Sequence, residues 1–171
     1  MFAIQTNKSK ILILSSLLFC IITDYLTKKI MITLLEGGKK HSFGGEFIQF
    51  SLVKNYDGFL GIAAPLPGPL RNGLLYGGVA LLILACLAYL FSSKPSNITV
   101  PLLFVTGGGL GNLLDRVLHN GGVTDFLSIG IGTFRTGIFN LADIYILDGS
   151  AVLGYYVFSS SPCRRIPDFT D

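Results

Sequence analysis

Four long apolar segments constrain the fold of this chain more than any other feature of its sequence. They run over roughly residues 10–25, 70–91, 98–118 and 138–158, and the first can continue as helix to about residue 35. Each can reach the ~20 residues that a helix needs to cross a bilayer, although the first and third do so only by including polar residues. Because backbone groups in lipid must be satisfied within their own segment, we expect these segments to be transmembrane helices.

The composition predicts a membrane protein with a single domain. Half of the 171 residues are hydrophobic and only 13% are charged, whereas soluble domains carry about 25% charged residues. The apolar segments leave no length for a second globular unit, so we interpret residues 1–171 as one integral membrane domain, expected to be monomeric. A formal net charge of +3 is too small to predict nucleic-acid binding, and membrane lipids are the expected surroundings.

The polar connections predict one small structured region outside the membrane. Residues 46–53 alternate between polar and apolar side chains, which indicates a short strand or an amphipathic element at the membrane surface. After the third apolar segment, repeated glycines indicate an extramembrane loop with Asp125 at its membrane-facing start. The predicted fold class is therefore an all-α polytopic membrane protein. It has four transmembrane helices and a small β or amphipathic element between helices one and two.

Two glycine pairs have the spacing of closely packed helices. Gly73 and Gly77 form one pair, and Gly107 and Gly111 form the other. Small residues four apart allow helix backbones to approach, so we expect both pairs to lie at helix–helix contacts. A phosphate-binding role for the glycines near Gly107 is less favoured, because no Lys-Ser/Thr pair follows and no strand precedes them. The sequence has no His/Cys cluster with metal-ligand spacing, so it implies neither a metal nor a cofactor.

The order of the four segments brings the polar residues to one membrane face. With both termini on one side, segments one and three end, and segment four begins, at the opposite face. Side chains at i and i+3 share a helix face, which applies to Asn112 with Asp115 and to Asn140 with Asp143. The residues expected at this face are Asp24, Lys28, Asn55, Asn112, Asp115, Arg116, Asp125, Asn140 and Asp143. In a helix beginning at residue 138, Asp143 would lie roughly 7–8 Å inside its start.

Asp125 and Asp143 are the strongest candidates for catalysis. Each is a lone carboxylate in apolar sequence, and a carboxylate in or near hydrocarbon costs ~2.5–3.5 kcal/mol and marks function. Two carboxylates brought together can share a proton and activate a water molecule, which is the chemistry of an aspartic protease. From the residues alone, the alternative is two unrelated carboxylates, each paired with a Lys or Arg in the bundle.

Five sequence blocks resemble the lipoprotein signal peptidase family, also called signal peptidase II. The blocks are residues 24–28, 53–55, 111–116, 123–126 and 139–143, and their order, spacing and the total chain length fit the family. The resemblance implies an aspartic intramembrane peptidase of bacterial inner membranes. Such an enzyme removes signal peptides from lipidated prolipoproteins, cutting before the diacylglyceryl-modified cysteine. It also implies a catalytic pair of Asp125 and Asp143, cytoplasmic termini and a site near the periplasmic face.

The remaining polar residues of these blocks are expected to bind substrate or to support the pair. Amide side chains can orient carboxylates or hold the substrate backbone, but they can also only join helices. Arg116 can pair with Asp115 or bind a lipid phosphate. Asp24 can contact substrate or bridge to Lys28, four residues on. The full expected set is Asp24, Lys28, Asn55, Asn112, Asp115, Arg116 and Asn140.

Two residues depart from the family pattern and keep other functions open. Asp57 stands where the family usually has Gly, and Asp148 where it has an aliphatic residue. Asp148 is five residues after Asp143, so it should lie on a different face of the helix. One alternative function is a small transporter, which would favour acidic residues near the midplane and an internal repeat. The other is an inactive homologue that only binds lipidated peptides.

Overall fold

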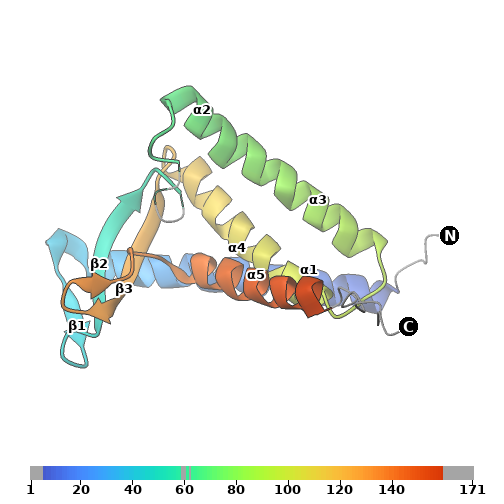
Figure 1. The fold of residues 1–171 in the computed structure, drawn as a ribbon, viewed down its shortest axis with the longest axis horizontal. Helices are drawn as coiled ribbons and strands as arrows, with labels where there is room; N and C mark the ends of the chain where they lie inside the picture. Colours follow the sequence, from blue (N-terminus) through green and yellow to red (C-terminus); the bar gives the residue numbers. More distant parts are fainter. Residues whose placement is uncertain (1–5, 59–60, 62, 160–171) are drawn as a thin grey trace, which may run out of the picture.

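The computed structural model describes residues 6–58, 61 and 63–159, which form a helical bundle with a small sheet at one end (Figure 1). α1 is the longest helix and the second segment is one continuous helical rod. That rod consists of α2, a π-helical turn at Gly73–Gly78, and α3. The helix bounds are Asn7–Leu34 for α1, Gly68–Asn72 for α2, Val79–Ser92 for α3, Thr99–Leu118 for α4 and Leu141–Ser159 for α5.

α4 is the central helix of the bundle. It packs against α1, α3 and α5, and its glycines allow the close approach. A Cβ atom added at Gly107 would lie 2.6 Å from Cys20 Cβ, and one at Gly111 would lie 2.7 Å from Asp24 Oδ2. The predicted helix contact of this glycine pair is therefore confirmed. Small residues replace the side-chain layer that would otherwise separate the helices.

The other glycine pair does not lie at a helix contact, so that prediction was wrong. Gly73 and Gly77 are exposed, and a Cβ atom at either would meet no described atom within 4 Å. They belong to the π-helical turn, where the rod is locally widened. π-helical turns are rare and frequently lie at functional sites. Here the neighbouring Leu74 and Leu75 line the cavity described below.

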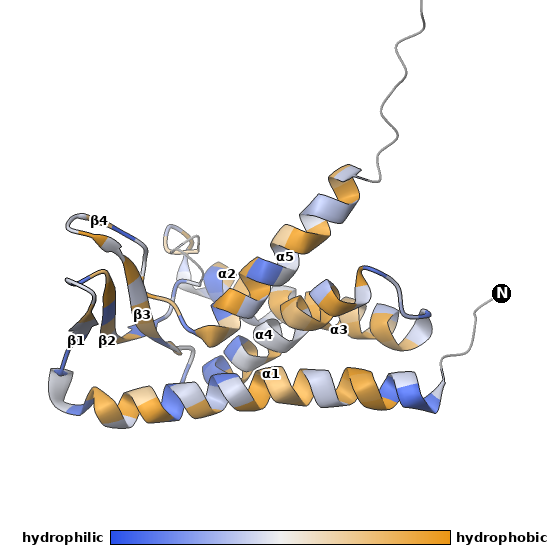
Figure 2. Ribbon diagram, turned by 90° about the horizontal axis from the view of Figure 1, so that it is seen from below, coloured by the Kyte–Doolittle hydropathy of each residue, from blue (hydrophilic) through white to orange (hydrophobic). Residues whose placement is uncertain are grey.

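Three of the predicted spans have the length and composition that membrane crossing requires: Asn7–Leu34, Gly68–Ser92 and Leu141–Ser159. Their outer surfaces carry exposed apolar side chains such as Ile11, Leu81 and Tyr155. Hydrophobic residues run along these helices in Figure 2. α4 is not among the three, because its glycines and the polar residues of its second half lower its mean hydropathy.

The sheet has four antiparallel strands in the order β1-β2-β3-β4. The predicted strand between the first two helices is confirmed, since β2 pairs with a short β1. The strand bounds are His41–Phe43 for β1, Ile48–Asn55 for β2, Val123–Ile131 for β3 and Phe134–Arg135 for β4. A register shift interrupts the pairing of β2 with β3 between Phe50 and Val53.

The loop predicted to carry Asp125 is wrong, because Asp125 lies on a strand. β3 pairs with β2, which places Asp125 opposite Val53 and Val123 opposite Asn55. The glycines that indicated a loop instead allow tight contacts within the sheet: a Cβ atom on Gly130 would overlap the backbone of β4. The sheet lies where α1 ends and α5 begins, and the α3–α4 connection lies at the opposite end of the bundle (Figure 1).

Candidate active site

Asp125 projects from β3 into a polar cluster at the sheet end of the bundle. Its side chain is 1% exposed. Asn55 Nδ2 donates a hydrogen bond to its Oδ2 at 2.9 Å, and Asn140 Nδ2 donates to its Oδ1 at 2.6 Å. Because β2 and β3 are adjacent strands, their pairing brings Asn55 to Asp125 across 70 residues of sequence. Both carboxylate oxygens of Asp125 thus have a fixed amide donor.

Asp143 is fixed at the N-terminus of α5 by reciprocal capping bonds. Asn140 Oδ1 accepts a hydrogen bond from the Asp143 backbone N–H at 3.0 Å, and Asp143 Oδ2 accepts one from the Asn140 backbone N–H at 3.1 Å. This pattern is a capping box, with Asn140 as the cap and Asp143 at the third helical position. The helix begins at Leu141, so Asp143 lies in its first turn. The predicted depth of 7–8 Å was therefore too large, because the helix starts later than residue 138.

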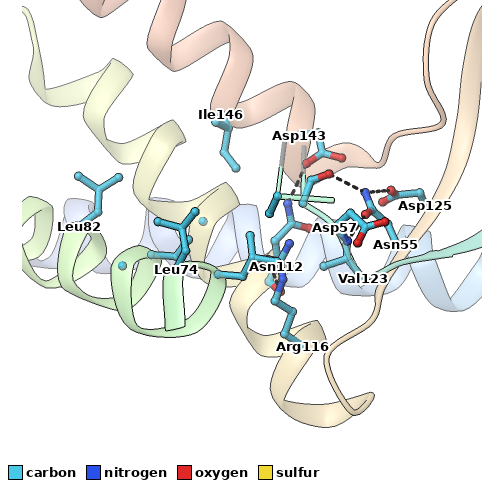
Figure 3. A pocket seen from close by; sticks show the side chains of 16 residues that line it. Asn55, Asp57, Leu74, Leu82, Asn112, Arg116, Val123, Asp125, Asp143 and Ile146 are labelled. Carbon is cyan, nitrogen blue, oxygen red and sulfur yellow. Dashed lines mark hydrogen bonds between the residues drawn. The ribbon is translucent and has the colours of Figure 1, made fainter. Parts of the chain in front are cut away.

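Asn140 links the two carboxylates directly. Its side-chain amide donates to Asp125, while its backbone N–H donates to Asp143. Asn112, on α4, holds the other Asp143 oxygen, with Nδ2 at 2.8 Å from Oδ1. Asn140 Nδ2 also contacts Asn112 Oδ1 at 3.1 Å. A strand, a central helix and a helix cap therefore converge on the two aspartates, and the dashed bonds to Asn55 and Asn112 are visible in Figure 3.

The environment of Asp125 favours retention of its proton to a higher pH than in an ordinary aspartate. Burial raises the pKa of Asp125 to about 6, and the nearby charge of Asp143 acts in the same direction. The hydrogen bonds from Asn55 and Asn140 oppose this rise in pKa, because they stabilise the ionised carboxylate. Two interacting carboxylates titrate as a pair, so one can hold a proton while the other is ionised.

Lys28 forms the centre of a second buried cluster behind the aspartates. Its ammonium nitrogen lies 2.7 Å from Asp24 Oδ2, 3.2 Å from Asp115 Oδ2 and 3.2 Å from Asn112 Oδ1. All four side chains are buried. The bridge from Asp24 to Lys28, left open by the sequence, is therefore formed. A buried ion cluster of this kind specifies geometry more than it adds stability, because desolvation offsets the attraction between charges.

Asp24 and Asp115, the two carboxylates of the Lys28 cluster, also accept hydrogen bonds from backbone N–H groups next to Asp143 and Asp125. Asp24 Oδ1 accepts a hydrogen bond from the Ala142 N–H at 3.0 Å, in the first turn of α5. Asp115 Oδ2 accepts one from the Thr124 N–H at 2.8 Å, beside Asp125. The cluster therefore fixes the residue preceding each aspartate. The sequence could not indicate these contacts, because backbone donors have no sequence pattern of their own.

Arg116 forms no ion pair with Asp115 in the described part of the chain, although that pairing was one of the two possibilities that the sequence left open. The Asp115 carboxylate instead contacts Lys28 and the ring of His119, whose Nδ1 is 3.1 Å from Asp115 Oδ1. Arg116 is buried, and its Nε has no hydrogen-bond partner within the described part of the chain. Its Nη1 makes a long contact of 3.5 Å to the Asn112 carbonyl. Arg116 also lies in the wall of the first of the two cavities described next.

Two apolar cavities meet at Asn55 and Asp143. The first, of about 420 Å³, is bounded by α3, α4 and the turn after β2, and includes Asn55, Arg116, Asp125 and Asp143 in its wall (Figure 3). The second, of about 540 Å³, lies between β3 and α5 and shares Asn55 and Asp143 with the first. The sequence did not indicate the α3 wall of the first cavity, because its side chains are ordinary Leu and Val.

Comparison with known proteins identifies the family. The family described as Signal peptidase (SPase) II matches residues 16–159. The chain belongs to the signal peptidase II family. A lipoprotein signal peptidase of Aquifex aeolicus is 32% identical over 151 residues, covering 88% of this chain and 86% of that protein. Another, from Chlorobium phaeobacteroides, is 28% identical over 160 residues, covering 88% of this chain and 92% of its own length. Membership makes the chain an aspartic peptidase and a membrane protein with lipoprotein signal peptidase function.

The fold agrees with that of two solved bacterial membrane enzymes. A bacterial membrane enzyme superposes with a TM-score of 0.75 at 23% identity, covering 99% of both chains. A second has a TM-score of 0.72 at 24% identity and covers 94% of this chain. The likeness extends to the sheet as well as the helices, because almost the whole chain is matched.

The two departures from the signal peptidase II pattern lie in different surroundings. Asp57 lies in the wall of the first cavity and forms an ion pair with Arg71, with 2.6 Å between Oδ1 and Nη1. Asp148 is exposed on α5, whereas Asp143 is buried, so the two lie on different faces of the helix as expected. Nothing in the structure explains Asp148.

Proposed function

We propose that Asp125 and Asp143 are the catalytic dyad with which this signal peptidase II removes signal peptides from prolipoproteins. The observation that carries the proposal is the double contact of Asn140. One residue holds both buried carboxylates, one through its side chain and the other through its backbone. Carboxylates brought together in this way, in an apolar setting, are suited to share one proton.

The proposed reaction begins with one aspartate ionised and the other protonated. The ionised carboxylate takes a proton from a water molecule, whose oxygen attacks the scissile carbonyl carbon. The protonated carboxylic acid donates its proton to the carbonyl oxygen, giving a tetrahedral intermediate. The C–N bond then breaks as the leaving amine takes a proton from one aspartate, and the other aspartate takes a proton from a hydroxyl of the intermediate, which restores the singly protonated dyad. The products are the free signal peptide and a lipoprotein that begins with the diacylglyceryl-modified cysteine.

The surrounding amides and ions are proposed to support this chemistry. Asn55, Asn112 and Asn140 hold the carboxylate oxygens, so the dyad needs little reorganisation when charge moves. The cluster of Asp24, Lys28 and Asp115 fixes the backbone on which the dyad is mounted. Arg116 lies in the cavity wall with an unpartnered Nε and is available to bind substrate oxygen atoms.

The apolar cavities suit the chemistry of a lipidated substrate. A prolipoprotein has apolar groups on both sides of the scissile bond: the signal-peptide helix before it and the acyl chains after it. Cavities on both sides of Asn55 and Asp143 provide room for both groups. Substrate that enters from the bilayer would reach the dyad without crossing bulk water.

We further propose that the whole chain is one monomeric domain with four transmembrane helices in a bacterial inner membrane. α4 is the additional spanning helix. It packs against α1, α3 and α5, and the polar residues of its second half are buried, so they need not face lipid. Both termini then lie in the cytoplasm, and the sheet and dyad lie near the periplasmic face. The partners are lipidated prolipoproteins and membrane lipids, and nucleic acid is not among them.

Cleavage of a lipidated prolipoprotein by the purified protein tests the proposal. Asp125→Asn and Asp143→Asn should each abolish the gel shift from precursor to product, since each removes one ionisable half of the dyad. Thermal unfolding in detergent checks that both variants are folded. Asp148→Asn, an exposed carboxylate on α5, is the matched control and should cleave normally. Near wild-type cleavage by either dyad variant would exclude this assignment.

A further inference from the structure

Asp57 adds a charged link to the turn that follows β2. Its Oδ1 accepts a hydrogen bond from Arg71 Nη1 at 2.6 Å, and both side chains are partly exposed, at 40% for Asp57 and 30% for Arg71. The position is one where the signal peptidase II pattern usually has Gly. A glycine there could not form this contact, so the link depends on the carboxylate of Asp57.

The same turn determines how the Asn55 amide is oriented. Asn55 Oδ1 accepts a hydrogen bond from the Asp57 backbone N–H at 3.0 Å. Its Nδ2 therefore faces the other way, where it donates to the Gly58 carbonyl at 3.2 Å and to Asp125 Oδ2 at 2.9 Å. The turn is conformationally demanding, because Gly58 has a φ of +80° and a Cβ atom there would lie 2.8 Å from Leu75. A shift of this turn would move the amide away from Asp125.

Arg71 ties the turn to the opposite wall of the first cavity. It lies on α2, one turn before Leu74 and Leu75, which line that cavity from the π-helical segment. Asn55, Asp57 and Gly58 line it from the turn. Asp57 and Asn55 lie side by side next to Asp125 in Figure 3. The ion pair thus links the turn after β2 to the helical rod that begins with α2. These two segments line the first cavity from different sides.

We propose that Asp57 and Arg71 are positioning residues, whose ion pair holds the turn after β2 so that the Asn55 amide stays on Asp125. This inference rests on the proposed function, because it assigns the pair an effect on the dyad. Neither residue touches the reacting atoms. Their contribution is the correct placement of a donor that stabilises ionised Asp125, and small displacements of such groups reduce the rate of reaction.

A partly exposed ion pair makes a modest contribution that depends on salt. Pairs of this kind typically change an equilibrium by about two- to fivefold, and added salt screens them. Loss of the Asp57–Arg71 pair should therefore lower kcat/KM by a similar factor and leave the protein folded. A single Nη1 contact is made, so a lysine at position 71 can replace the arginine.

The test measures kcat/KM on a lipidated prolipoprotein at low and high NaCl for Asp57→Asn, Arg71→Gln and the double variant. Each single variant should lose about two- to fivefold at low salt, the double variant should lose no more than either single, and high salt should bring the wild type towards the variants. Arg71→Lys should stay within about twofold of the wild type. Glu36→Gln removes an exposed carboxylate elsewhere and should have no effect.

The pH profile separates positioning from a structural role. A loosened Asn55 stabilises ionised Asp125 less, so the pH–rate profile of Asp57→Asn should move to higher pH. Additive losses in the double variant, an unchanged pH profile, or a rise in KM alone would overturn the inference. Asp125→Asn is assayed in parallel. If it is inactive while Asp57→Asn matches the wild type, only the positioning role fails; if the wild type itself does not cleave, both proposals fail.

Discussion

Asn140 shows how much of the candidate site depends on one residue. It directly precedes α5 and caps that helix, and its side chain donates a hydrogen bond to Asp125 on β3. The sequence predicted Asn140 as a supporting residue. The cap was not predicted, because the apolar Ile138 and Phe139 indicated an earlier helix start, although Asn140 is a favoured N-cap residue directly before Leu141. Helix ends are set by such local hydrogen bonds, which the apolar pattern does not record.

Asp125 should make stability depend on pH in a direction opposite to most carboxylates. Its pKa is raised from 3.8 in the unfolded chain to about 6 in the folded protein. Below about pH 4 both states hold the proton, and between pH 4 and 6 only the folded state retains it. The contribution to stability is therefore fully present at low pH and is lost as pH rises through 6. Two pKa units correspond to roughly 3 kcal/mol.

The measurement compares thermal unfolding of the wild type and Asp125→Asn between pH 4 and pH 8 in detergent. As pH rises, the melting temperature of the wild type should fall relative to that of the variant, because ionisation of buried Asp125 destabilises the folded wild type and asparagine does not ionise. The direction of this change is informative even though the amide also alters hydrogen bonds at every pH. A difference that stays constant, or moves in favour of the wild type, would show that Asp125 is not held protonated.

At the scale of elements, the sequence predicted the helices and the strand character between the first two of them, but it did not predict β3 and β4. Long apolar segments determine where helices cross a bilayer. The third segment ends at Leu118 as predicted, and the first continues to Leu34, as the sequence allowed beyond its apolar part. β3 was missed because its partner β2 lies about 70 residues earlier, so no local pattern reports the pairing. Strand pairing at this separation is a tertiary contact, and the glycines in and around β3 made the local pattern look like a loop.

The close contact of α4 and α5 predicts a sharp difference between two glycines of α5. A Cβ atom at Gly149 would lie 2.5 Å from the Pro101 carbonyl oxygen, whereas one at Gly154 would meet no described atom within 4 Å. Gly149→Ala should therefore destabilise the protein by about 1–3 kcal/mol through overpacking. Gly154→Ala should be neutral or slightly stabilising, because alanine favours the helix. Thermal unfolding of the two variants in detergent measures this difference.

The outcome also bears on the catalytic site. α5 carries Asp143 and packs on α4, which carries Asn112, so a shift of α5 in Gly149→Ala should also reduce cleavage. The Gly154→Ala variant controls for the added methyl group. Equal stability of the two variants would mean that the helices have room to separate, and that their packing does not hold the two side chains together.

For the whole molecule, the clustering of polar residues followed from span order. α1, α4 and α5 contribute from the membrane side, and β2 and β3 contribute from the sheet, all at one end of the bundle. The sequence predicted that these residues share one face of the membrane, but it did not predict which of them are in contact. The partners of Lys28 and Arg116 depend on how the helices are rotated about their axes, and charge alone does not choose between neighbouring carboxylates.

The orientation of this assembly can be measured with reporter fusions. A reporter inserted at residues 92–97, between α3 and α4, should indicate the cytoplasm. A reporter near Gly130, at the tip of β3, should indicate the periplasm. Four spans with both termini on one side require these two positions to differ. A cytoplasmic signal near Gly130 would separate the sheet from the proposed periplasmic face and contradict the topology.

The pairing of β2 with β3 has a consequence for how the enzyme is made. During synthesis β2 emerges first, and its partner strand follows only after two further helices. Until then β2 has an open edge, and Asn55 has no Asp125 to contact. Closing the sheet must await synthesis of the segment after α4, because long-range pairing cannot precede the arrival of the second strand. The nascent chain therefore lacks the assembled pair of Asp125 and Asp143, which we propose to be catalytic, until β3 has paired with β2.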